Sequence, residues 1–247
     1  MCLVTVIIPY FKKKNYIKET LISIIEQSHE NLEIIIVNDA DHSNQYYLEE
    51  LKKLDKRIIL LKNDNNLGAG FSRNRAIKIS RGKYLAFCDA DDLWNTFKIE
   101  KQIQFMNSIN AKFSYTSFDV IDRSNKIIGE RKAKPYTKFN DLIKSCDIGL
   151  STVIIEKKII DFHKIYFPNI KTKEDYIFWL NLAKKGVEMI GLDQKLSNWR
   201  KLDNSLSSSN FQKILDGYKV YRYYMKFNII KSMFHLFILA FNKFLRR

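Results

Sequence analysis

The chain has 247 residues, of which 46% are apolar and 28% are charged, and it carries a net charge of +15. This size and composition are typical of a globular protein with one large α/β domain or two small ones, and the 8 Gly and 3 Pro exclude long disordered linkers. The three cysteines have neither disulfide nor metal-site spacing, and we expect no signal peptide and no transmembrane helix, hence a cytoplasmic protein.

The first 90 residues predict a regular alternation of strands and helices. Short β-branched runs predict buried strands, and apolar residues at helical spacing fill the stretches between them. The predicted strands are residues 4–8, 33–37, 57–61 and 84–88, and the predicted helices are 15–28 (with Asn15 as N-cap), 45–54 and 71–80. This alternation is typical of an α/β protein whose mostly parallel sheet is covered by helices on both faces.

The second half of the chain has a less regular pattern. Helices are predicted for residues 97–108 and 174–185, short strands for 112–118, 151–155 and 187–191, and a polar loop for 199–210.

Polar residues follow each strand predicted for the first half, at the edge where parallel sheets bind their ligands. They are Pro9-Tyr10, Asn38-Asp39, residues 63–66 and residues 89–92. The last group holds three carboxylates, Asp89, Asp91 and Asp92, which repel each other unless a cation lies between them. Carboxylate oxygens suit a hard divalent cation such as Mg²⁺ or Mn²⁺.

Two pairs of interpretations stay open for these acidic residues. In an extended chain Asp89 and Asp91 share one face and can hold a cation, whereas in the other interpretation the cluster caps a helix that starts near Leu93. Similarly, Glu174 and Asp175 are either the acidic first turn of a helix, which spacing alone favours, or a general base.

The turn at residues 63–75 is rich in Asn and Gly and contains two arginines, Arg73 and Arg75, that could meet a phosphate or a base. Asp39 alone is a common turn former. Neither a GxGxxG nor a P-loop signature is present, which disfavours dinucleotide binding and ATP cleavage.

Taken together, several stretches resemble in consistent order the motifs of inverting family 2 glycosyltransferases with the GT-A fold. They are VTVIIPYF, EIIIVNDAD, NNLGAGFSRNRAI and GKYLAFCDADDLW, and later KEDYIFWLNLAKKG and WRKLDNSLSS. The resemblance implies a GT-A catalytic domain over 1–210, with a Rossmann-like nucleotide-sugar half (about 1–95) and an acceptor half (96–210). A basic amphipathic helical tail (211–247) lies outside the resemblance.

For the donor side, the resemblance implies a UDP-sugar site that needs Mn²⁺ or Mg²⁺. Asp39 would bind the uracil, and Pro9 and Tyr10 would line the nucleotide pocket. Arg73 would lie near the nucleotide, and Asp89 would face the ribose. Asp91 would coordinate the metal as in a DxD motif, while Asp92 would join the metal, orient the acceptor or cap the following helix.

For the acceptor side, the resemblance implies that Asp175 is the catalytic base, supported by Glu174, and that Arg200 lies near the diphosphate. The chain departs from the family where Asn38 replaces an Asp and where Leu202 replaces a His that can bind the metal. The metal would then have fewer protein ligands, or Asp203 would replace the His. The absence of QxxRW disfavours a processive synthase.

The reaction that the resemblance implies is a single displacement that inverts the anomeric centre and forms a β-linkage. The donor would be a UDP-hexose, with glucose or galactose favoured. By analogy with small enzymes that carry DADD, the acceptor would be an N-acetylhexosamine on a lipid diphosphate, in O-antigen, lipopolysaccharide or capsule synthesis.

The end of the chain concentrates positive charge, with eight Lys or Arg and one Asp in residues 213–247. From residue 218 onward these basic residues are mixed with aromatic and aliphatic ones. This pattern predicts a helix that lies on the inner face of the cytoplasmic membrane, so the protein would be peripheral. The alternative is a helix that packs on the catalytic domain.

Two other functions compete with glycosyl transfer. The net charge also suits a nucleic-acid-binding protein, but acidic strand ends would repel phosphate and no recognised module is present, so we expect no nucleic-acid partner. Paired carboxylates also suit a metal-dependent nucleotidyltransferase, although PYFKKKNY is a poor match to the early loop of that class.

Overall fold

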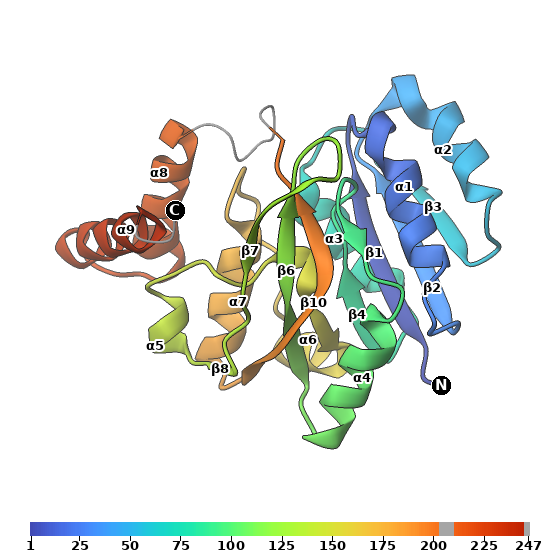
Figure 1. The fold of residues 1–247 in the computed structure, drawn as a ribbon. Coiled ribbons are helices and arrows are strands. Elements are labelled where there is room, and N and C mark those ends of the chain that lie inside the picture. The colour runs from blue at the N-terminus through green and yellow to red at the C-terminus, as the bar shows by residue number, and fades with distance from the viewer. Residues whose placement is uncertain (203–209, 245–247) are drawn as a thin grey trace.

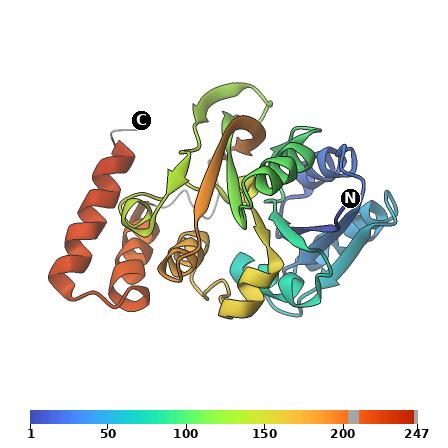
Figure 2. The same ribbon diagram turned by 90° about the horizontal axis from the view of Figure 1, so that it is seen from below.

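Among the residues that the structure describes, ten strands form one sheet with helices on both faces (Figures 1 and 2). The structure is a computed structural model, and it describes residues 1–202 and 210–244. The strands are β1 (Val4–Tyr10), β2 (Leu32–Asn38), β3 (Ile58–Lys62), β4 (Tyr84–Phe87), β5 (Leu93–Trp94), β6 (Phe113–Ile121), β7 (Ile127–Arg131), β8 (Tyr136–Thr137), β9 (Ile154–Glu156) and β10 (Met189–Arg200).

The order of strands across the sheet is β3-β2-β1-β4-β9-β6-β10-β5, while β7 pairs with β6 and β8 with β10. The first four strands pair in parallel, and β6 and β10 run in the same direction, whereas β9 and β5 run against them. Every residue of β1 and of β2 is buried, which is what β-branched runs such as VTVII achieve between two layers of helices. The predicted α/β class with a mostly parallel sheet is confirmed.

Two layers of helices bury the two faces of the sheet. The helices are α1 (Lys14–Ile25), α2 (Gln45–Lys52), α3 (Ala69–Ile79), α4 (Lys98–Ser108), α5 (Phe139–Leu142), α6 (Lys157–His163), α7 (Glu174–Lys184), α8 (Asn210–Lys219) and α9 (Ile229–Phe244). Helices α1, α2 and α4 pack on one face of the sheet, whereas α3, α6 and α7 pack on the other (Figure 2). Trp179 of α7 is fully buried among aromatic side chains at the centre of the second layer.

The strands and helices predicted for the first 90 residues are all present, but the predicted N-cap was wrong, and one of the two interpretations of the acidic cluster is excluded. Helix α1 begins at Lys14 with Lys13 at its N-cap, so Asn15 is not the cap. No helix starts near Leu93, because residues 93–94 form β5 and α4 begins only at Lys98. The acidic cluster therefore does not cap a helix.

The second half contains elements that the sequence pattern did not indicate. Strands β7 and β8 and helices α5 and α6 were not predicted, and Leu150–Thr152 forms a 3₁₀ turn before β9. Strand β10 continues through Trp199 and Arg200, which were predicted to lie in a loop. Most of the remaining predicted loop, including Asp203, lies outside the described residues.

The end of the chain forms α8, a π-helical turn (Val220–Tyr224) and α9, which pack beside α7 and α5 (Figure 1). The hydroxyl of Tyr221 donates to the Ile143 carbonyl at 2.9 Å and lies 3.2 Å from the hydroxyl of Tyr176 on α7. Val220, Met225 and Leu239 belong to the same buried apolar cluster as Trp179 of α7. Within the described residues, none of the helices is long and apolar enough to span a bilayer.

Candidate active site

A cleft of about 770 Å³ opens beyond the carboxyl ends of β1, β2, β4 and β10 and reaches the first turn of α7. Ten residues that the sequence singled out for the site line it: Pro9, Tyr10, Asp39, Arg73, Asp89, Asp91, Asp92, Glu174, Asp175 and Arg200. Arg75 does not, because its guanidinium donates to the Lys62 carbonyl and to Asn63 Oδ1 in the turn after β3. The structure therefore brings together side chains that are up to 191 positions apart in the sequence (200 minus 9). This is the edge where a doubly wound sheet binds its ligand.

Asp39 organises the turn that follows β3. Its carboxylate is buried and accepts hydrogen bonds from the side-chain amide of Asn63 at 2.8 Å and from the backbone N–H groups of Leu67 at 2.9 Å and Gly68 at 2.8 Å. Gly68 has a φ of +88°, a conformation that a side chain would strain, and it leads directly into α3. Asp39 thus holds the rim of the cleft as well as lining it, and its contact with uracil stays a prediction.

Arg73 of α3 connects the turn after β4 with the start of α7. Its guanidinium is 3% exposed and donates to Asp89 Oδ1 at 2.8 Å and to Glu174 Oε1 at 2.8 Å. Burial lowers its pKa, but the two carboxylates raise it by more, so the group stays charged. The close approach of α3 to α7 needs Gly70, because a Cβ there would lie 3.0 Å from the Pro168 carbonyl oxygen and 3.4 Å from Glu174 Cγ.

Asp91 forms an ion pair that the sequence did not indicate. Lys13 Nζ lies 2.5 Å from Asp91 Oδ2, and the only sequence signal for Lys13 is its place just after β1. Burial raises the pKa of Asp91, Lys13 opposes this rise, and Asp89 adds to it. Residues 89–92 form a turn in which the Asp92 N–H donates to the Asp89 carbonyl at 3.1 Å, so the expectation that an extended chain aligns Asp89 with Asp91 was wrong.

Asp92 connects the 89–92 turn by hydrogen bonds to the end of β10 and to the 3₁₀ turn before β9. Its side chain is buried and accepts from the Arg200 N–H at 2.9 Å and from the Ser151 hydroxyl. Ser151 in turn accepts from the Asp89 N–H at 3.0 Å. Burial and the neighbouring Asp91 and Asp89 raise the pKa of Asp92 well above its usual range. Since both of its oxygens are engaged, Asp92 is a poor candidate for a metal ligand, and that role stays a prediction.

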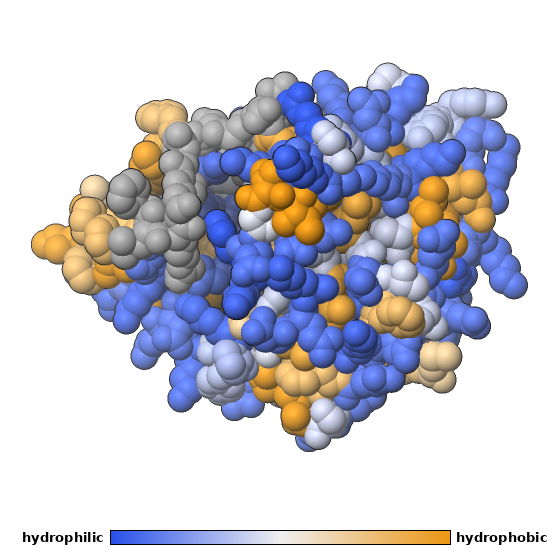
Figure 3. All heavy atoms as spheres, viewed as in Figure 1, coloured by the Kyte–Doolittle hydropathy of each residue, from blue (hydrophilic) through white to orange (hydrophobic). Residues whose placement is uncertain are grey.

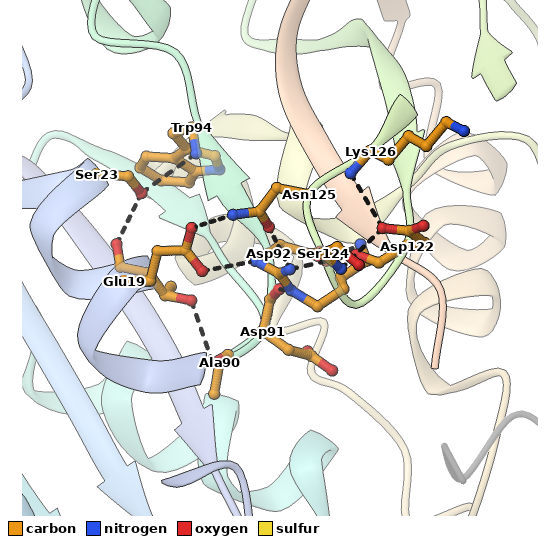
Figure 4. A network of polar contacts seen from close by, with 12 residues as sticks. Glu19, Ser23, Ala90, Asp91, Asp92, Trp94, Asp122, Ser124, Asn125 and Lys126 are labelled. Atoms are coloured by element: carbon orange, nitrogen blue, oxygen red, sulfur yellow. Dashed lines mark hydrogen bonds and ion pairs between the residues drawn. The ribbon is translucent and has the colours of Figure 1, made fainter. Parts of the chain in front are cut away.

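Arg200 lies at the end of β10, where its guanidinium faces α1 and the turn after β6. Its Nε donates to the Asp91 carbonyl at 2.8 Å, and its Nη2 donates to Glu19 Oε2 at 2.9 Å. Glu19 also accepts from Asn125 at 2.6 Å, and Figure 4 shows these two side chains directed toward each other beside Asp91 and Asp92. These contacts give Arg200 the role of positioning the 89–92 turn, and its predicted contact with a diphosphate stays untested.

Glu174 and Asp175 begin α7 and have different environments. Glu174 is paired with Arg73, whereas Asp175 makes no ion pair within the described part of the chain and accepts only the adjacent Tyr176 N–H at 2.7 Å. Burial and Glu174 raise the pKa of Asp175 to about 6, although Lys173 and Arg73 oppose the rise. A carboxylate that is unpaired, basic and directed at a cleft has the properties of a general base.

The carboxylates of the cleft fit a divalent cation only if substrate phosphates or water supply its remaining ligands. The described residues hold no group of three His, Cys, Asp or Glu side chains that could bind a metal. Asp89 and Asp91 each have one carboxylate oxygen engaged by a basic side chain and one left for a cation. Mg²⁺ is commonly held in this way, by one or two carboxylates together with substrate phosphates and water.

Comparisons with known proteins agree with this geometry. Residues 5–161 match the family described as glycosyl transferase family 2. TuaG of Bacillus subtilis, named as a teichuronic acid biosynthesis glycosyltransferase, is 33% identical over 93% of this chain and 91% of its own. WfaP of Escherichia coli is 35% identical over 87% of this chain and 84% of its own, and is named as a UDP-Glc:α-D-GlcNAc-diphosphoundecaprenol β-1,3-glucosyltransferase.

Solved structures show the same fold. TarS of S. aureus, crystallised with UDP-GlcNAc, superposes with a TM-score of 0.76 over 96% of this chain and 70% of its own, at 19% identity. The mannosyltransferase PcManGT of Pyrobaculum calidifontis, in complex with GDP-Man and Mn²⁺, superposes with a TM-score of 0.70 over 94% of this chain and 69% of its own, at 14% identity. Because the family match covers residues 5–161, more than half of the chain, and relatives at least 33% identical align along most of its length, the chain belongs to glycosyl transferase family 2.

Proposed function

We propose that this chain is an inverting glycosyltransferase that moves a hexose, glucose or galactose, from a UDP-sugar to a hydroxyl of an N-acetylhexosamine on a lipid diphosphate. The product is a β-glycoside in bacterial surface polysaccharide synthesis, either O-antigen and other lipopolysaccharide or capsule. The observation that carries the proposal is the unpaired carboxylate of Asp175, which lines the same cleft as Asp39, Asp89 and Asp91. The names of WfaP and of WfgD, a second relative from Escherichia coli that is 32% identical, support the donor and acceptor classes, and the name of TuaG supports a role in polysaccharide synthesis.

On the acceptor side, Asp175 takes the proton from the attacking hydroxyl. Its pKa of about 6 keeps it mostly ionised at pH 7 and makes it more basic than an ordinary aspartate. Glu174 contributes by raising that pKa, while its own charge is balanced by Arg73. Attack on the face opposite the leaving diphosphate inverts the anomeric centre and gives the β-linkage from an α-linked donor.

On the donor side, Asp39 binds the uracil, Pro9 and Tyr10 line the nucleotide pocket and Asp89 faces the ribose. Asp91, once released from Lys13, would hold Mn²⁺ or Mg²⁺, which would supply positive charge beside the departing diphosphate. Family membership decides against the alternative classes, a nucleic-acid-binding protein and a nucleotidyltransferase.

A transfer assay tests this function directly. The purified chain with Mn²⁺ should transfer hexose from UDP-glucose or UDP-galactose to a short-chain GlcNAc diphosphate lipid, and NMR of the product should show a β-linkage. The control is the same diphosphate lipid without its GlcNAc, which should accept no hexose. An α-linked product, or transfer from neither UDP-hexose, would contradict the proposal.

We further propose that the chain binds the inner face of the cytoplasmic membrane through an exposed apolar surface on its last helix. This tail face consists of Ile229, Ile230, Met233, Phe234, Phe237 and Phe241, all at least 50% exposed. Figure 3 shows apolar side chains gathered at the end of the molecule formed by α8 and α9. The eight basic residues of 213–247 complement anionic lipid head groups.

Replacing Phe234 and Phe237 together by Asp should lower sedimentation with phosphatidylglycerol vesicles at least tenfold, because it places two charges where apolar rings would enter the lipid. Phe162→Asp is the matched control, since Phe162 is 82% exposed on α6, away from the tail. Equal sedimentation of the double variant and the control would show that the tail face does not bind the membrane.

A further inference from the structure

Six basic side chains line the cleft, and they fall into two groups: Lys13, Arg73 and Arg200, and Arg131, Lys171 and Lys173. Each member of the first group forms an ion pair with carboxylates. Lys13 pairs with Asp91, Arg73 with Asp89 and Glu174, and Arg200 with Glu19. The members of the second group make no ion pair within the described residues. They come from β7 and from the loop before α7, in the half of the chain that does not carry the nucleotide motifs.

The loop that carries Lys171 and Lys173 is fixed to the end of the chain. Thr172, which lies between the two lysines, is buried and donates to Asp216 Oδ2 of α8 from its N–H at 3.1 Å and from its hydroxyl at 2.9 Å. Asp216 is itself fully buried. Tyr224 adds a third contact, from its hydroxyl to the Asn169 carbonyl at 3.4 Å. The loop that carries the two lysines is therefore fixed in place by its hydrogen bonds to α8 and to Tyr224.

The same loop leads directly into the candidate base. Lys173 precedes Glu174 and Asp175, its ammonium lies 5.8 Å from the centre of the Tyr176 ring, and it opposes the rise in the pKa of Asp175. The loop of Lys171 and Lys173 thus connects Asp175 with α8, which leads through the π-helical turn to α9 and the tail face. A lipid-linked sugar presents its groups in the same order, namely hydroxyl, diphosphate and hydrocarbon chain.

We propose that Arg131, Lys171 and Lys173 form a subsite for the diphosphate of the acceptor, and that the Thr172–Asp216 contact holds the loop of the two lysines in place against α8. The inference rests on the proposed function and assigns a place to one part of its acceptor. Arginine and lysine bind phosphate oxygens through charge-assisted hydrogen bonds, and a pair of phosphates matches a set of several cations.

The test compares two acceptors in solution, without membranes: GlcNAc linked to a short alkyl chain through a diphosphate, and the uncharged alkyl glycoside of GlcNAc. For the double variant Arg131→Gln/Lys171→Gln, the ratio of kcat/KM for the charged acceptor to that for the uncharged one should fall at least tenfold, through KM. Lys173 is kept because it acts on Asp175. Arg131→Lys/Lys171→Arg should restore the ratio.

The matched control is Lys52→Gln/Lys78→Gln, which removes two exposed charges on α2 and α3 outside the cleft and should leave the ratio unchanged. An unchanged ratio in the Arg131/Lys171 variant overturns the subsite. An equal rise in the KM for UDP-sugar would assign the cations to the donor diphosphate, and a loss confined to vesicle binding would assign them to lipid head groups. Both results would overturn it as well.

Failure of the proposed function gives a different result. The wild-type chain would then transfer to neither acceptor, and calorimetry of the charged acceptor analogue with the UDP-bound chain becomes the measurement of the subsite. Tenfold weaker binding to the Arg131/Lys171 variant than to the lysine control would support the subsite on its own, and equal binding would overturn it.

Discussion

Asp175→Asn should lower the rate of hexose transfer about 1,000-fold while the affinity for UDP stays unchanged. The amide keeps the size of the side chain and can still accept the hydrogen bond from the Tyr176 N–H, so the start of α7 should be preserved. It cannot take a proton from the acceptor hydroxyl. Single-turnover transfer and calorimetric UDP binding measure the two effects separately.

The pH dependence of the wild type provides a second measure of the same group. Because the pKa of Asp175 is raised to about 6, the side chain gains a proton as the pH falls through that value. The base is then lost, so kcat/KM should fall about tenfold for each pH unit below 6. The residual activity of Asp175→Asn should lack this acidic limb.

Asp161→Asn is the matched control for both measurements, since Asp161 is exposed on α6. It should keep both the rate and the acidic limb of the wild type. Full transfer activity in Asp175→Asn, or an unchanged pH profile, would assign the base to another residue.

The parallel half of the fold could be predicted because its signals are local. Runs such as VTVII and EIIIV are mostly β-branched and apolar, which is typical of a strand buried on both faces, and the helices between them have apolar residues at regular spacing. Polar residues after each strand then had to meet at one edge of a parallel sheet. The common cleft of Asp39, Asp91 and Asp175 follows from this topology and from the resemblance.

The features that were missed depend on partners distant in sequence. Strand β7 is largely exposed and exists because β6 offers it an edge, and β10 continues to Arg200 because β6 pairs with it along most of its length. The ion pair of Lys13 with Asp91 spans 78 positions, and no spacing rule connects them. The contacts of Arg200 with Glu19 and the Asp91 carbonyl likewise needed the folded structure.

The pairing at Asp91 also shows how the chain's own groups balance the carboxylates of the cleft. Asp89 is balanced by Arg73 and Asp91 by Lys13, while Asp92 is satisfied by the Arg200 N–H and Ser151. Of these three carboxylates, only Asp91 is paired with a flexible, partly exposed lysine. Its ion pair is therefore the easiest to exchange for a metal ion.

Asp91→Asn should reduce transfer about 100-fold and weaken Mn²⁺ binding in the presence of UDP by roughly tenfold or more, because it removes the negative charge that holds the cation. Lys13→Met should have the opposite effect on Mn²⁺, about tenfold tighter binding, since it leaves the partly buried Asp91 without its ammonium partner beside Asp89. Electron paramagnetic resonance of free Mn²⁺ measures both affinities.

Asp161→Asn again provides the control and should bind Mn²⁺ like the wild type. If Asp91→Asn retains metal-dependent transfer and full Mn²⁺ affinity, Asp91 is not the metal ligand. If Lys13→Met leaves the Mn²⁺ affinity unchanged while Asp91→Asn lowers it, Asp91 still binds the metal, but Lys13 does not compete for it. The two variants together thus distinguish the residue that binds the metal ion, Asp91, from the lysine that pairs with it.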